Sequence, residues 1–273
     1  MLPVVLALLW ALYEGYRWVW EQTGWTRPFP VNERTMPHIH DIVGQLFEPS
    51  RRNGPVLGGV LLDAALFTAK EAFVGLVIGA TVGFLLAVLI VHSVVLARGL
   101  MPYIVASQTI PILAIAPMVV VGLGAIEIFG WTPSDWQRVS VISAYLTFFP
   151  VTINTVRGLS SVDPRALQLM RSYASGNWAI LWKLRVPTSL PYVFAALKVS
   201  ATASVVGAII GELPSSIQEG LGGKILNFNQ YYSTVPENLW ATNIVAAMLG
   251  ICFFLGVVAL EKLVVHRAPE RFS

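Results

Sequence analysis

Residues 72–91 read AFVGLVIGATVGFLLAVLIV, an apolar stretch without a charged side chain. A helix rising 1.5 Å per residue needs about 20 such residues to cross the hydrocarbon core of a bilayer. Three further stretches of similar length carry no charge, and a fourth carries only Lys198; they are residues 103–126, 139–156, 239–260 and 190–211. The sequence therefore predicts five membrane-spanning helices.

The composition excludes a soluble domain. Hydrophobic residues make up 55% of the 273 residues and charged residues 12%, whereas soluble proteins carry about 25% charge. Cys252 is the only cysteine, which excludes a disulfide scaffold. The apolar stretches are twice as long as the roughly 10-residue alternating strands of a membrane β-barrel. We therefore expect an all-α polytopic membrane protein.

The N-terminal stretch, residues 2–20, is a weaker candidate for a sixth span. Glu14 and Arg17 interrupt it, although their spacing allows them to pair on one helix face. With the N-terminus inside, nine basic residues fall on the cytoplasmic side and seven outside, and the densest cluster lies in the loop 157–190. This distribution predicts that both termini are cytoplasmic.

This topology divides the chain into three parts. Residues 1–60 form an N-terminal span and an external loop, residues 61–265 form the core, and residues 266–273 form a cytoplasmic tail. At the boundary between the first two parts we expect an interfacial helix at residues 60–70. Thr68 and Glu71 have the spacing of a capping box just before the second span.

Glycines and prolines inside the spans predict how the helices pack. Two sets of glycines recur four residues apart: Gly75, Gly79 and Gly83, and Gly207 and Gly211. This spacing allows helices to pack closely, and we interpret it as packing within one subunit. Pro111 and Pro117 interrupt the third span, and a broken helix is tolerated where its backbone lines a cavity. We therefore expect this span to form a wall of a pathway.

Polar residues near the middle or ends of the spans are candidates for lining that pathway. Serine and threonine in membrane helices also bond to their own backbone, so both interpretations stay open. The candidates are Ser107, Gln108, Thr109, Asn154, Thr202, Ser204 and Glu212. For Lys198 we expect the amine to reach the membrane interface, with contact to an anionic solute as the alternative.

The loop 157–190 is too long for a turn and too polar for a span. Asp163 and Pro164 form a strong helix start, with an N-cap followed by proline at the first helical position. We expect helices at residues 165–173 and 178–184, separated by a break at residues 175–177. Such an amphipathic helical hairpin suits docking into a groove of a soluble partner.

This hairpin resembles the cytoplasmic signature loop, or EAA loop, of ATP-binding-cassette (ABC) importer permeases. Their pattern is E-A-A-x3-G-x9-I-x-L-P, and alignment on Pro187 places residues 168–170 at E-A-A and Ala174 at the Gly. The spacing is kept but the Glu and the Gly are replaced. We expect Ser175 and Gly176 to supply the turn instead.

The resemblance covers about residues 60–265. Its closest branch is the nitrate/sulfonate/taurine and pyrimidine/riboflavin-precursor branch, and the segments that carry it are Phe148-Phe149-Pro150, Asn154-Thr155-Val156-Arg157-Gly158-Leu159 and Gly211-Glu212 followed by Gly220-Leu221-Gly222. It implies a homodimer in a prokaryotic inner membrane, two ATPase subunits that bind ATP and Mg²⁺, and an external solute-binding protein. The residues implied in coupling to the ATPase are Asp163, Leu167, Gln168, Met170, Ala174, Ser175, Gly176, Trp178 and Pro187.

Two other classes remain as alternatives, a secondary transporter and an intramembrane enzyme. The five spans contain no acid or histidine, so we expect no catalytic residue and no cofactor in this chain. No G-x-x-x-x-G-K-[ST] motif occurs in this chain, and the resemblance implies that a partner subunit hydrolyses ATP. His38 and His40 form an H-x-H pair, which we interpret as part of a solvated loop rather than as a metal site. Because Lys198 is the one cation within the spans, the sequence mildly favours an uncharged or aromatic solute over nitrate or sulfonate.

Overall fold

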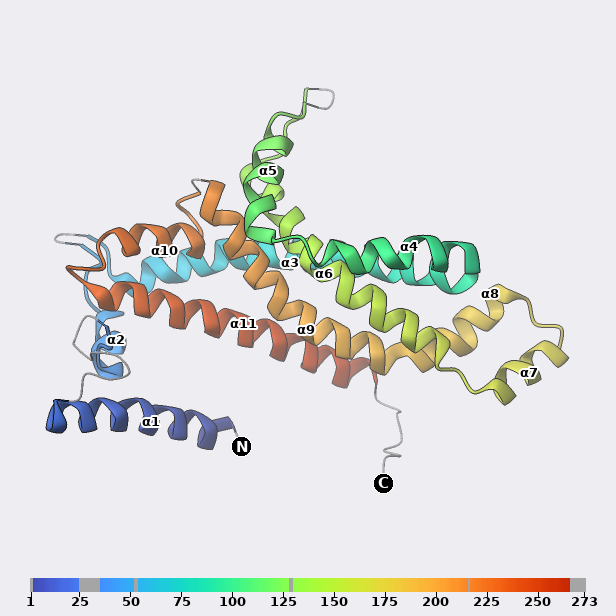
Figure 1. Ribbon diagram of the computed structural model, residues 1–273, viewed down its shortest axis with the longest axis horizontal. Helices are drawn as coiled ribbons and strands as arrows, with labels where there is room; N and C mark the ends of the chain where they lie inside the picture. Colours follow the sequence, from blue (N-terminus) through green and yellow to red (C-terminus); the bar gives the residue numbers. More distant parts are fainter. Residues whose placement is uncertain (1, 25–34, 52–53, 128–129, 216, 266–273) are drawn as a thin grey trace. The chain divides into compact units, whose positions relative to one another are not determined.

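The structure is a computed structural model that describes residues 2–24, 35–51, 54–127, 130–215 and 217–265 (Figure 1). Its regular elements are helices, and the described residues otherwise contain an isolated bridge between Pro49 and Val56. The α-helices are α1 (Leu2–Thr23), α2 (Ile39–Gln45), α3 (Leu57–His92), α4 (Val94–Ser107), α5 (Ile112–Gly124), α6 (Asp135–Ser160), α7 (Pro164–Ser172), α8 (Asn177–Ile180), α9 (Val186–Glu212), α10 (Leu221–Gln230) and α11 (Pro236–Val264). A π-helical turn, Leu181–Arg185, joins α8 to α9, and a 3₁₀ turn, Leu213–Ser215, follows α9.

The chain divides into two compact units. The first unit contains Met1–Leu66 and Gln218–Ala247, and the second contains Phe67–Ile217 and Met248–Ser273. The second unit covers most of the predicted core, including the whole hairpin.

Helix α6 is the centre of the second unit, and glycines bring its neighbours close. A Cβ on Gly79 of α3 would lie 2.5 Å from the carbonyl oxygen of Ala144 in α6, and one on Gly83 would lie 2.6 Å from that of Phe148. On the other side, a Cβ on Gly207 of α9 would lie 2.9 Å from the Cα of Ser143. Both predicted glycine faces therefore pack within one chain, as expected.

The predicted break in the third span is confirmed. Helices α4 and α5 are separated by residues 108–111 and bend by 101° at that point. Pro111 is the N-cap of α5 in an extended conformation, whereas Pro117 lies inside α5 without ending it. The bend thus occurs at the first proline only.

The region before the second span corrects the sequence prediction. Residues 60–70 are not a separate interfacial helix, because α3 runs without interruption from Leu57 to His92. Thr68 and Glu71 consequently lie inside a helix and form no capping box. Thr68 Oγ1 instead donates a hydrogen bond to Glu212 Oε1 of α9 (2.6 Å).

Among the described residues, four helical segments are long and apolar enough to cross a membrane, and a fifth is obtained when α4 and α5 count as one broken span. The four are α3, α6, α11 and the continuous run Asn177–Glu212. Together with the broken span, they correspond to the five apolar stretches predicted as spans from the sequence. The weaker sixth, residues 2–20, is helical in α1 but does not belong to this set.

The first unit combines α1, α2, the start of α3, α10 and the start of α11. The chain before α3 is tied by backbone bonds, from Leu57 N to Glu48 O and from Gly58 N to Leu46 O, both 2.8 Å. Arg51 Nη2 donates to Asn227 Oδ1 (2.9 Å), which connects the loop before α3 to α10.

Candidate functional site

The predicted hairpin is present between α6 and α9 (Figure 1). Helix α7 begins as expected: Asp163 is its N-cap, and one carboxylate oxygen accepts the N–H of Arg165 at 2.8 Å. Pro164 follows at the first helical position, where no partner is needed for a backbone N–H. The start of the hairpin is therefore fixed by local chemistry alone.

The turn of the hairpin is built differently from the prediction. Ala174 has φ +53°, and among the described residues it alone takes a positive φ without being glycine. Its N–H donates to Arg171 O (2.9 Å), and the N–H of Ser175 donates to Met170 O (3.1 Å). These two bonds form a Schellman motif. Ala174 itself therefore makes the turn that Ser175 and Gly176 were expected to make.

The signature-loop pattern has glycine at the position of Ala174. Glycine adopts a positive φ without penalty, whereas an L-residue pays about 1–2 kcal/mol there. The backbone at Ala174 thus keeps the positive φ that the glycine of the pattern would adopt, although the residue here is alanine. Local strain at this turn is the consequence.

The second arm of the hairpin continues directly into a membrane span. Helix α8 passes through the π-helical turn into α9, so residues 177–212 form one helical run. Pro187 lies near the start of α9 and does not end it. The prediction of a separate helix at residues 178–184 is therefore wrong at its C-terminal end.

Buried side chains anchor the base of the hairpin. Leu181 is fully buried in a cluster with Ala87 of α3 and Leu159 of α6. Leu167 of α7 is half-buried and lines a hollow of about 130 Å³ together with Ile180 and the end of α3. The arms of the hairpin consequently rest on α3 and α6 at their base.

The outer surface of the hairpin is apolar and basic. Leu169 is 57% exposed, Tyr173 77% and Trp178 68%, and Trp178 stacks edge-to-face on Trp182 with ring centroids 5.8 Å apart. Most of the other predicted coupling residues are also accessible: Asp163, Gln168, Ala174, Gly176 and Pro187 are exposed, and Met170 and Ser175 are partly buried. Exposed aromatic and apolar groups beside arginines are typical of a protein-docking surface.

The structure brings together two of the predicted pathway residues. Ser107 and Gln108 line a cavity of about 330 Å³ at the bend between α4 and α5, with Tyr145 and Phe149 of α6. The hydroxyl of Tyr145 donates to the carbonyl of Ser107. Thr109 is not part of this lining. Sequence analysis missed Tyr145, although it is the one tyrosine in residues 139–156.

Three of the other predicted pathway residues bond to their own helices. Asn154 Nδ2 donates to Pro150 O (2.8 Å), and Thr202 Oγ1 donates to Val199 O (2.9 Å). Ser204 Oγ donates to Ala201 O (2.8 Å). Glu212 lies apart from these three, fully buried and bonded to Thr68 as described above.

Lys198 has a partner that the sequence did not predict. Its Nζ lies 2.5 Å from Glu261 Oε2 of α11, and both side chains are about one quarter exposed. The two charges neutralise one another, so Lys198 offers no isolated positive charge to a solute.

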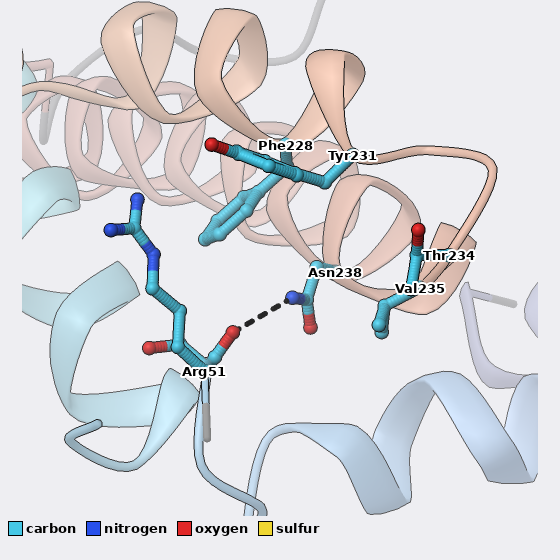
Figure 2. Close-up of a pocket in the computed structure, with 7 residues that line it drawn as sticks. Arg51, Phe228, Tyr231, Thr234, Val235 and Asn238 are labelled. Carbon is cyan, nitrogen blue, oxygen red and sulfur yellow. Dashed lines mark hydrogen bonds between the residues drawn. The ribbon is translucent and has the colours of Figure 1, made fainter. Parts of the chain in front are cut away.

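A second cavity, of about 260 Å³, lies in the first unit (Figure 2). Phe228 and Tyr231 of the α10 end form one wall, and Arg51 and Asn238 form another. Asn238 Nδ2 donates to Ser50 O (3.3 Å). This cavity was not anticipated from the sequence.

Residues 79–268 match the family model described as the binding-protein-dependent transport system inner membrane component. A formylaminopyrimidine transport permease protein of Halalkalibacterium halodurans is 31% identical over 70% of this chain and 71% of its own length.

More distant relatives extend the similarity. A protein of Bacillus subtilis named as a putative aliphatic sulfonates transport permease is 26% identical over 71% of this chain and 66% of its own length. A nitrate import permease protein of Synechococcus elongatus is 24% identical over 86% and 76%, respectively. The crystal structure of an amino acid ABC transporter with histidines superposes with a TM-score of 0.60 at 16% identity, covering 76% of this chain and 95% of the other. The last match supports the fold alone.

Proposed function

Because the chain belongs to the binding-protein-dependent inner-membrane components of ABC transport systems, and is thus an importer permease subunit, we propose that it couples ATP hydrolysis in a partner to solute movement through residues 163–187. The relatives reported above are named as transport permeases. ATP and Mg²⁺ are bound by the ATPase in this proposal, and a second copy of the chain completes the pathway.

The exposed apolar surface of the hairpin carries the proposal. Leu169, Tyr173 and Trp178 present apolar side chains that nothing within the described residues covers fully. We place the hairpin on the cytoplasmic side of the membrane, because its arms contain the densest basic cluster and basic loops are typical of that side. An ATPase with an apolar groove rimmed by acids complements this surface in both respects.

The test replaces Leu169 with aspartate in the complex of permease, ATPase and binding protein. Leu169 is 57% exposed, so the change leaves the fold intact while placing a charge in the docking surface. We expect loss of ATPase from the purified complex, or hydrolysis that the loaded binding protein no longer stimulates. The matched control is Leu263→Asp in α11, which makes the same change at a 70% exposed position outside the hairpin. Normal assembly and transport by the Leu169 variant would refute the coupling assignment.

For the solute, we propose a small uncharged or aromatic organic molecule such as a pyrimidine or a vitamin precursor. The cavity at the α4–α5 bend combines the amide of Gln108 with the rings of Tyr145 and Phe149, which suits a planar heterocycle. Lys198 is neutralised by Glu261 and gives no anion site. The name of the Halalkalibacterium relative points in the same direction.

Uptake by reconstituted complex distinguishes the solutes. A radiolabelled aminopyrimidine and radiolabelled taurine are offered with the cognate binding protein and ATP. The proposal expects uptake of the aminopyrimidine only, and uptake of taurine only would overturn it.

A further inference from the structure

The short segment before α2 is held against one face of α1. Tyr13 Oη donates to the carbonyl of Pro37 (2.8 Å), and Arg17 Nη1 donates to the carbonyl of Met36. Both donors lie in the C-terminal half of α1, four residues apart and therefore on the same face. The backbone just before α2 is consequently held at a fixed position against α1.

The same contact places three metal-ligating side chains together. Glu14 lies on α1, and His38 and His40 lie at the start of α2. One ligand atom from each of the three residues lies within 4.8 Å of the other two. His38 Nδ1 is 2.9 Å from Glu14 Oε2, and the second carboxylate oxygen accepts the N–H of Ile39 at 3.2 Å. The rings of His38 and His40 have centroids 4.9 Å apart. The pair predicted as part of a solvated loop therefore supplies two of the three members of a compact cluster.

We propose that Glu14, His38 and His40 form a binding site for zinc or a similar late first-row divalent cation. Two imidazoles and one carboxylate are borderline ligands that suit Zn²⁺ rather than Mg²⁺ or Ca²⁺, and three protein ligands leave one coordination position for water. Donor atoms about 2.0–2.2 Å from zinc are separated by roughly 3.3 Å in a tetrahedral site. The spacing between Glu14 and His38 already approaches this value. The His40 side chain is 76% exposed, so its ring can rotate toward the cation; its Nε2 lies 3.2 Å from Asp41 Oδ1, a contact that this rotation would change.

Neighbouring charges support the proposed ligand set. The second ring nitrogen of His38, Nε2, lies 3.9 Å from Glu21 Oε1. A carboxylate on the far nitrogen of a ligating histidine orients the ring and raises its basicity. Glu21 in turn is paired with Arg17 at 3.0 Å. A bound cation would join α1 to the start of α2, independently of the hairpin and of the proposed transport function.

Zinc titration of the purified full-length chain tests the site, after chelator treatment and with an affinity tag that contains no histidine. We expect one Zn²⁺ per chain by calorimetry, and an increase in melting temperature on adding Zn²⁺ that Mg²⁺ does not produce. His38→Ala and His40→Ala should each weaken binding more than about tenfold, because even outer partners of metal sites cost about 10–100-fold.

Two further variants separate loss of the site from loss of the fold. Glu14→Gln keeps the shape and the acceptor for Ile39 N–H, so it should retain the melting temperature of the metal-free chain while binding zinc at least tenfold more weakly. His92→Ala removes a histidine from α3, where the ring bonds its own helix at Val88 O, and should leave the affinity unchanged. Equal zinc affinity in the wild type and in the His38→Ala/His40→Ala double variant would overturn the proposal.

Discussion

Replacing Ala174 with glycine should stabilise the hairpin by about 1 kcal/mol, although the substitution removes a methyl group and forms no new contact. The methyl is exposed, so little apolar burial is lost. Relief of the positive φ gains about 1–2 kcal/mol, and the greater freedom of glycine in the unfolded chain costs about 0.4–1 kcal/mol. The balance is favourable at this position because the backbone is left-handed.

Amide hydrogen exchange on the permease in detergent measures the effect where it occurs. The amides of Ala174 and Ser175 close the turn through their bonds to Arg171 and Met170. A gain of about 1 kcal/mol corresponds to roughly fivefold slower exchange at these amides when the exchange rate follows the equilibrium of local opening.

The matched control is the same substitution at Ala166, inside α7. There the backbone is right-handed helix, so glycine should destabilise by about 0.5–1 kcal/mol and speed exchange. Opposite signs at the two positions are the signature of the Schellman turn. Equal acceleration by both substitutions would show that Ala174 is not left-handed and that the turn lies elsewhere.

Two further predictions concern the packing of the second unit. Gly79→Ala should destabilise the folded chain by about 1–3 kcal/mol, because its Cβ would meet the backbone of α6 at 2.5 Å. Gly122→Ala in α5, where a Cβ meets nothing within 4 Å, should instead stabilise by up to about 1 kcal/mol, because alanine is the better helix former; thermal unfolding in detergent compares the two variants. Lys198→Glu should cost more than the roughly 1 kcal/mol of a surface ion pair, and adding Glu261→Lys should recover most of the loss. A double variant as unstable as the sum of its two single variants would show that the pair contributes nothing.

The sequence predicts the spans and the packing faces because both depend on local patterns. A bilayer-length stretch without charge is sufficient to identify a span, and glycines four residues apart fall on one helix face whatever they contact. The start of α7 is equally local, since Asp163 and Pro164 act on the adjacent backbone. These features needed no knowledge of distant parts of the chain.

The errors arise where a distant partner changes the meaning of a polar residue. Thr68 and Glu71 mark a helix start in the sequence, but in the structure Thr68 bonds Glu212, 144 residues away, and α3 continues through both positions. Lys198 is similar, because Glu261 belongs to the last helix. His38 was interpreted by its neighbours in the chain, whereas its contact with Glu14 depends on how the segment folds back on α1.

The continuity of the hairpin with α9 bears on how force would reach the membrane. A separate helix ending before Pro187 would leave a flexible joint between the ATPase contact and the bundle. The observed helical run Asn177–Glu212 is instead about 54 Å long at 1.5 Å per residue, and its far end is held to α3 by the bond from Thr68. If the ATPase binds the hairpin as proposed, a displacement there is passed to α9 through a continuous helical run, which pivots where Leu181 is buried against α3 and α6. The π-helical turn at that pivot interrupts the regular α-helical bonding, and Pro187 and Pro191 each remove a backbone donor just after it, so bending is expected to concentrate in residues 181–191.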